Sequence, residues 1–139
     1  MSKLQTLLEN GSKAKAEIQF IAIKRIEADM KRRVFNDGKA TDGSSLGKYK
    51  SRSHIKKRTE RGRQTGYKDL DFEGDLRRSL TTGEQGQKAV LGFTTNRQRL
   101  IAEGQEKQTG KSIWEPSKSE IDAAGETVVA EIKIRLSAK

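Results

Sequence analysis

The chain has 139 residues, and its 29 Lys and Arg residues against 19 Asp and Glu residues give a formal net charge of +10. This length favours one domain spanning residues 1–139. Only about a fifth of the residues are Leu, Ile, Val or Phe, so we expect a small core that subunit contacts supplement. The lack of cysteine and the single histidine exclude disulfides and a Cys/His zinc site.

Residues 12–35 are predicted to form one amphipathic helix. Ser12 is a suitable N-cap, and the basic residues of the last turn suit the negative end of the helix dipole. The segment Asn36-Asp37-Gly38 tolerates left-handed backbone conformations and is expected to end the helix. The apolar residues recur at spacings of three and four: Ala14, Ile18, Ile21, Ala22, Ile26, Met30 and Val34.

Residues 37–75 have few apolar side chains and no clear period, and we interpret them as an extended polar and basic arm with room for a short hairpin. Between Leu46 and Lys68, nine Lys and Arg residues stand against a single acidic residue, Glu60. Such a block repels itself and favours a polyanion or an acidic protein surface, although a solvated loop is the alternative. The predicted contact residues are Lys48, Lys50, Arg52, Lys56, Lys57, Arg58, Arg61 and Arg63.

The next region is predicted to form a small antiparallel β region. Residues 75–81 and 88–94 have the composition of strands, and the turn-rich residues 82–87 separate them. Asn96 is then expected to cap a short helix that ends before Gly104.

The last predicted helix covers residues 118–136. Ser117 and Glu120 have the spacing of a capping box, in which each side chain bonds the other residue's amide. An apolar stripe follows, made of Ile121, Gly125, Val128, Ile132 and Leu136. Together these elements predict an α+β fold, with the two long amphipathic helices packed on the small antiparallel β region and the long basic arm extending from it.

The sequence offers little for catalysis or for ligand chemistry. His54 lies in a lysine-rich stretch without a plausible nucleophile partner. The acidic residues Asp69, Asp71, Glu73 and Asp75 alternate, but they lack the calcium-loop pattern, and pairing with the basic segment in cis or in the next subunit is the simpler interpretation. No phosphate-binding glycine motif and no membrane-spanning apolar run occur. We therefore expect no enzyme, cofactor, metal, small-molecule substrate or membrane partner.

Three aromatic residues are candidates for a subunit interface: Trp114, Tyr49 and Tyr67. Trp114 immediately precedes the capping box, so a hydrophobic staple from Ile113 or Trp114 onto Ile121 or its neighbours is the simpler role. Tryptophan is also enriched at the energetic centres of interfaces, and both roles can hold at once.

The order of four segments resembles a known family. They are the glycine-rich stretch 36–49, the sequence Gly-Asp-Leu-Arg-Arg-Ser-Leu at 74–80, Ile-Ala-Glu-Gly at 101–104, and Ile-Trp-Glu-Pro-Ser at 113–117. Between about residues 12 and 136 the chain resembles the tailed-phage virion morphogenesis proteins, the tail-completion and head–tail joining (neck) group. The high positive charge of the arm departs from that family.

The resemblance implies a structural virion protein, assembled in the host cytoplasm, that forms a homo-oligomeric ring at the portal–tail junction. Its partners would be portal, neck or tail proteins, and the arm would reach neighbouring subunits, another ring or the DNA channel, where non-specific DNA contact is open. The residues alone also fit a basic nucleic-acid-binding module or an adaptor for an acidic protein. Charge reversal at Lys56, Lys57 and Arg58 would abolish binding in the nucleic-acid case.

Overall fold

The computed structural model describes residues 11–71, 74–86 and 88–137. None of the helices within those residues is long and apolar enough to cross a membrane. The predicted α+β class is confirmed. The elements are α2 (Gly11–Lys31), its π-helical continuation η1 (Arg32–Asn36), α3 (Arg52–Glu60), α4 (Asp75–Ser79), β1 (Leu80–Gln85), β2 (Lys88–Phe93), α5 (Asn96–Thr109) and α6 (Lys118–Ser137).

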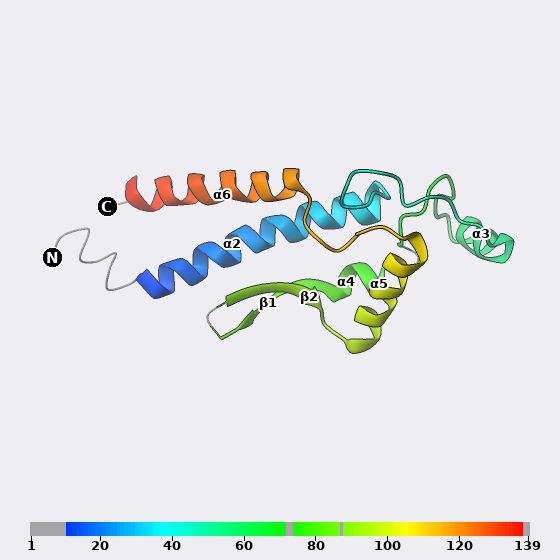
Figure 1. Ribbon diagram of the computed structural model, residues 1–139, viewed down its shortest axis with the longest axis horizontal. Helices are drawn as coiled ribbons and strands as arrows, with labels where there is room; N and C mark the ends of the chain where they lie inside the picture. The colour runs from blue at the N-terminus through cyan, green and yellow to red at the C-terminus, as the bar shows by residue number, and fades with distance from the viewer. Residues whose placement is uncertain (1–10, 72–73, 87, 138–139) are drawn as a thin grey trace.

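Helix α2 is the central element of the fold. It packs against α6 and also against both strands, and Figure 1 shows α6 along one side of α2 and the hairpin on the other. The arm, with α3 at its tip, extends beyond the C-terminal end of α2. The core is small and includes Met30, Val34, Phe35, Leu80 and Ile113. We refer to everything except the arm (residues 37–71) as the body.

A buried ion pair joins the end of α2 to the start of α6. Arg33 donates from Nε to Glu120 Oε2 at 2.8 Å, and its Nη2 donates to the carbonyl oxygens of Ile113 at 2.9 Å and Glu115 at 3.1 Å. Its Nη1 donates to the carbonyl oxygen of Lys39 at 3.1 Å. One guanidinium therefore ties α2, the start of the arm and the entry to α6 together.

The antiparallel pairing is confirmed, but the predicted boundary of the first strand is wrong. Residues 75–79 form the single-turn helix α4, which begins after Gly74 with its left-handed φ of +83°. The strand begins at Leu80 and runs through residues predicted to form the turn, pairing Leu80 with Phe93 and Gln85 with Lys88. The two β-branched threonines after Leu80 favour the extended conformation there.

Helix α5 is longer than predicted. Its N-cap is Thr95, which accepts a hydrogen bond from the Gln98 amide at 3.2 Å, and the helix continues past Gly104 to Thr109. An interior glycine costs only about 1 kcal/mol, and the packing of the buried Ala102 against the core offsets that cost. Gly110, with a φ of +69°, ends the helix.

The capping box of α6 is confirmed. The Glu120 amide donates to Ser117 Oγ at 3.2 Å, and the Ser117 amide donates to Glu120 Oε1 at 2.9 Å. The helix covers Lys118–Ser137, as predicted within one residue. Its C-terminal end is tied to α2 by Arg135, which donates to Glu17 Oε2 at 2.8 Å.

Candidate functional site

The arm is folded around one buried cation. Arg58 is 1% exposed, and its Nη2 donates to both carboxylate oxygens of Asp69 at 3.0 and 3.2 Å. Its Nε and Nη1 donate to the carbonyl oxygens of Gln64 and Asp71, and the Tyr49 ring lies 4.4 Å from its guanidinium carbon. Arg58, one of the predicted contact residues, thus uses its donors inside the arm.

Tyr49 belongs to the same buried cluster. Its hydroxyl donates to Asp69 Oδ1 at 3.0 Å and accepts from the amides of Asp69 and Leu70. Burial, together with the neighbouring Asp69 carboxylate, raises the pKa of the Tyr49 phenol. Tyr49 thus stabilises the arm, and it is half-buried rather than displayed as an interface residue.

The described aspartates of the acidic row pair with arginines of the same chain. Asp69 binds Arg58, and Asp71 Oδ2 lies 3.7 Å from a guanidinium nitrogen of both Arg63 and Arg77. Asp75 pairs with Arg78. Glu73 lies outside the described residues. Pairing with the basic segment in cis, one of the two interpretations of this row, is confirmed for Asp69 and Asp71, whereas the partner of Asp75 lies outside that segment.

The short helix α3 presents the remaining cations of the arm. Ser51 caps it by accepting from the His54 amide at 3.3 Å, and it ends before Gly62, whose φ is +70°. The sequence alone does not predict this helix, because its residues have no apolar period. Seven of the eight predicted contact residues are exposed: Lys48, Lys50, Arg52, Lys56, Lys57, Arg61 and Arg63.

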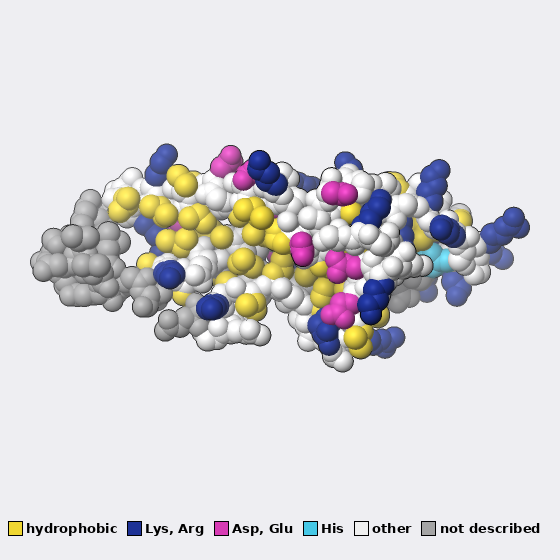
Figure 2. Space-filling model, viewed as in Figure 1, with side chains coloured by type: hydrophobic (Ala, Val, Ile, Leu, Met, Phe, Trp, Pro, Cys, Tyr) yellow, Lys and Arg dark blue, Asp and Glu magenta, His cyan; other side chains and the backbone are white. Residues whose placement is uncertain are grey.

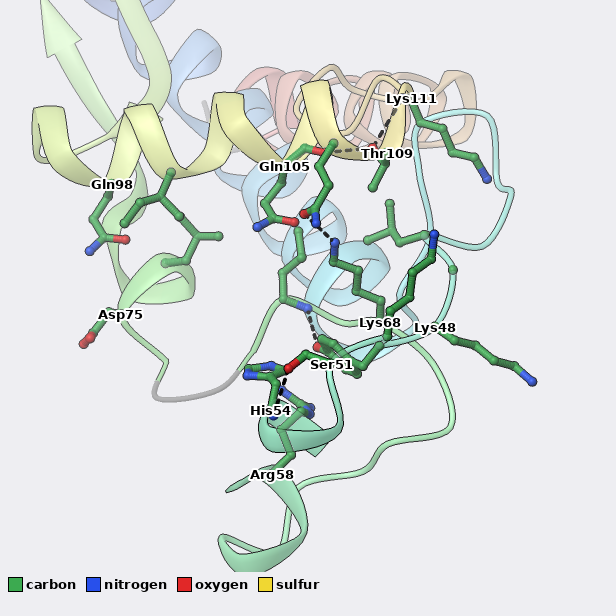
Figure 3. Close-up of a pocket in the computed structure, with 18 of the residues that line it drawn as sticks. Lys48, Ser51, His54, Arg58, Lys68, Asp75, Gln98, Gln105, Thr109 and Lys111 are labelled. Atoms are coloured by element: carbon green, nitrogen blue, oxygen red, sulfur yellow. Dashed lines mark hydrogen bonds between the residues drawn. The ribbon is translucent and has the colours of Figure 1, made fainter. Parts of the chain in front are cut away.

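A cleft of about 840 Å³ lies between the root of the arm and helices α4 and α5. In Figure 3, Gln105 and Thr109 extend from α5 on one side, while Ser51, His54 and Arg58 lie on the arm opposite. Cations line it from both sides, and Asp75 is the only acidic residue among the described residues of its wall. The cations are Lys48, Lys50, Arg58, Lys68, Arg97 and Lys111.

Two polar groups in the cleft are in unfavourable surroundings: one is a partly buried ammonium near another cation, and the other is a buried oxygen without a hydrogen-bond donor in the described part of the chain. Burial and the nearby charge of Lys50 lower the pKa of Lys68, whose ammonium donates to Gln108 Oε1 at 3.0 Å. The side-chain oxygen of Gln105 is buried and accepts no hydrogen bond from any described residue. The sequence does not predict that Arg97, Gln105 and Lys111 line a cleft with the arm. Nothing in their local sequence connects them to a basic segment about 30 or more residues away.

The other two aromatic candidates also have structural roles. Trp114 packs edge-on against Phe93, with ring centroids 5.1 Å apart, lies 5.9 Å from the Phe35 ring, and donates from Nε1 to the Ala102 carbonyl. Ile121 itself is 53% exposed, and Ile113 is buried in the core cluster that also contains Ala124 of α6. Tyr67 donates to the Asn36 carbonyl at the root of the arm and stays partly exposed.

The apolar stripe of α6 turns away from α2. Glu120 and Ala124 are buried, whereas Ile121, Ile132 and Leu136 are 53%, 39% and 48% exposed. Figure 2 shows hydrophobic side chains gathered over the half of the molecule that holds α6 and the first part of α2, and blue cations clustered at the arm. We call the residues Ile121, Gly125, Val128, Val129, Ile132 and Leu136 the α6 stripe.

Comparison with known protein families, with curated proteins and with solved structures finds no match to this chain.

Proposed function

We propose that this chain is a structural subunit of a tailed-phage particle, which forms a homo-oligomeric ring at the head–tail junction and contacts portal, neck or tail proteins. The position in the particle comes from the resemblance of segments 36–49, 74–80, 101–104 and 113–117 to the tail-completion and head–tail joining group. The ability to assemble rests on surfaces of the molecule itself.

The single observation that carries this proposal is the outward orientation of the α6 stripe. A surface helix normally turns its apolar side toward the core of its own domain. Here Ile121, Val129 and Ile132 are between 39% and 53% exposed, while the buried side of the helix holds Glu120 and Ala124. Exposed apolar patches of this kind mark protein–protein interfaces, and further copies of the same chain are the occupant that we propose.

The shape of the molecule agrees with an assembly subunit. The arm extends beyond the end of α2 (Figure 1), away from the half of the molecule where hydrophobic side chains gather (Figure 2). A subunit with its apolar surface at one end and a projecting arm at the other can contact two different neighbours at once. Such heterologous contacts close into a ring when the rotation between subunits permits.

The proposal is tested by weakening the α6 stripe without disturbing the fold. Ile121→Ser and Ile132→Ser together should convert the oligomer into monomers of unchanged helicity, as measured by mass photometry and circular dichroism, because both side chains are already exposed in the monomer. Ile134→Ser is the matched control, since Ile134 is 61% exposed but two residues from Ile132, and therefore on another side of the helix. A wild-type protein that stays monomeric at high concentration would contradict ring formation.

The place in the particle needs a separate experiment. A tagged chain should be recovered from productively infected cells after nuclease treatment, and its partners identified by mass spectrometry. We expect portal, neck or tail subunits to remain bound. Loss of all partners after nuclease would mean that nucleic acid, not a virion protein, connects the chain to them.

A further inference from the structure

The cleft between the arm and α5 concentrates positive charge that the protein neutralises only in part, since Arg58 is the one wall cation that pairs with a carboxylate of the described residues, that of Asp69. Its wall contains six cations and one carboxylate among the described residues, and that carboxylate, Asp75, already pairs with Arg78. The nearby acids Asp69 and Asp71 pair with Arg58, Arg63 and Arg77. A cleft of this kind attracts a ligand that carries several negative charges.

Four of the six cations are lysines, which act as point charges rather than as planar forks. Lys48 and Lys50 come from the arm, and Lys111 comes from the loop after α5. Figure 3 shows the Lys48 and Lys111 side chains at the outer side of the cleft, where Lys111 Nζ donates to the Ser45 carbonyl oxygen. Lys68 lies between them, partly desolvated and repelled by Lys50. Phosphate groups placed among these ammonium groups would relieve that repulsion.

The same cleft also has groups that a bare phosphate would leave unused. Gln105 Oε1 is buried and needs a hydrogen-bond donor, which a sugar hydroxyl or a base amino group supplies. Leu70, Leu76 and the exposed Ile101 provide apolar wall, and the Tyr49 and His54 rings lie 5.0 Å apart on the arm side. Phosphates, hydrogen-bond donors and flat apolar faces occur together in nucleotides.

The size of the cleft decides which form of nucleic acid fits. About 840 Å³ lies within the range of nucleotide-sized ligand sites and is too small for a duplex to enter. Beyond the cleft, Arg52, Lys56 and Lys57 are exposed along α3 and continue the positive surface.

We propose that the cleft between the arm and α5 is a binding site for single-stranded nucleic acid. Lys48, Lys50 and Lys111 hold phosphates, and Gln105 accepts a hydrogen bond from a sugar or base. The exposed cations of α3 extend the contact along the strand. Because Arg58 and Asp69 already hold the arm in place, binding does not have to order it, which lowers the entropic cost. The site lies in one chain and is therefore independent of ring formation.

The experiment measures binding of fluorescently labelled oligothymidylate to the full chain by anisotropy, over a range of salt concentrations. A duplex of equal length is the comparison, and we expect the single strand to bind more tightly. The logarithm of the association constant should fall with the logarithm of salt concentration by about 0.7 for each phosphate contact. Lys50→Ala with Lys111→Ala should weaken binding roughly tenfold and flatten that slope by about 0.7 for each lysine.

Two further variants separate a built site from general positive charge. Lys15→Ala with Lys133→Ala removes two exposed cations from α2 and α6, away from the cleft, and should leave both affinity and slope almost unchanged. Gln105→Met removes the buried acceptor at similar volume, and should weaken binding several-fold without changing the salt slope, because no charge is lost.

The proposal would be overturned by no binding at low salt, by equal losses in the cleft and control variants, or by tighter binding of the duplex. Competition by poly-glutamate as effective as that of oligothymidylate would also overturn it, and would favour an acidic protein as the ligand. The monomeric Ile121→Ser, Ile132→Ser protein should still bind the oligonucleotide. Failure of ring formation and failure of nucleic-acid binding are thus distinguished.

Discussion

The body and the arm each bury one arginine, but the surroundings of the two side chains differ. Arg33 lies beside the core residues Met30 and Val34 and pairs with Glu120. Arg58 pairs with Asp69 in an arm that has no fully buried hydrophobic side chain between residues 47 and 71. In the body the ion pair orients elements that apolar packing already holds together. In the arm the Arg58–Asp69 ion pair holds the segments together where no hydrophobic core is present between residues 47 and 71.

This difference explains how so polar a segment keeps a defined shape. A buried ion pair adds little net stability over apolar packing, but removing one partner is costly because the other charge stays buried. The arm thus depends on Arg58 for its conformation, whereas the body can lose a contact and remain folded. Three predictions separate these roles.

The largest effect is expected at Arg33. Arg33→Met should lower the free energy of unfolding of the body by about 4 kcal/mol, because Glu120 stays buried without its partner. Urea unfolding followed by Trp114 fluorescence measures this, since Trp114 packs in the body. The control is Arg32→Met, whose side chain is 65% exposed and pairs only with Asp29 along the same helix. Equal losses in both variants would contradict the stabilising role of the Arg33–Glu120 ion pair.

A slightly smaller and local effect is expected at Arg58. Arg58→Met should lower the opening free energy of the arm by about 3 kcal/mol while the urea midpoint of the body stays unchanged. Hydrogen exchange at the amides of Arg63, Lys68 and Asp71 reports on the arm, because these amides are bonded within it. Lys57→Met, at an exposed neighbour, should change neither value. A body that melts earlier in Arg58→Met would show that the two regions are one cooperative unit.

The smallest effect is expected at Glu27, whose ionisation contributes to the pH dependence of the stability of the body. Burial alone would raise the pKa of Glu27, but hydrogen bonds from Thr82 and Lys24 and the charge of Lys31 lower it below its ordinary value of 4.5. Its stabilising contribution is therefore present above the ordinary pKa and is lost as the pH falls through the lower folded-state pKa. Glu27→Gln should cost about 1 kcal/mol at neutral pH and flatten the acid dependence of unfolding.

Urea unfolding at several pH values checks this prediction. Glu84→Gln, at an exposed position of β1, the strand that contains Thr82, should keep the wild-type acid dependence of unfolding. An unchanged acid profile in Glu27→Gln would mean that other carboxylates dominate it.

Local sequence signals predicted the elements of the body well. The capping box of Ser117 and Glu120 depends on residues three apart, so the start of α6 was found correctly. The rotation of α6 about its axis was not predictable in that way. It depends on the pairing of Arg33 with Glu120, 87 positions apart in the sequence. It also depends on the pairing of Arg135 with Glu17, 118 positions apart.

The candidate site was predicted only in part, for the same physical reason. The charge of the arm was evident from composition, but nothing local distinguishes Arg58 from Lys56 and Lys57 beside it. Only the fold brings Arg58 to Asp69, and only the fold places Gln105 and Lys111 across the cleft from the arm. Residue types thus predicted the positive charge of the region, but which of its similar cations becomes buried depends on the three-dimensional fold.

The long separation of Arg33 from Glu120 also has a consequence for synthesis of the chain. Helix α2 leaves the ribosome well before α6, and a contact between residues 87 positions apart has to close a large loop. During translation α2 therefore waits with its α6-facing side uncovered. The step that finally covers it also turns the α6 stripe outward, so the surface that we propose for assembly forms only once the body of the chain is complete.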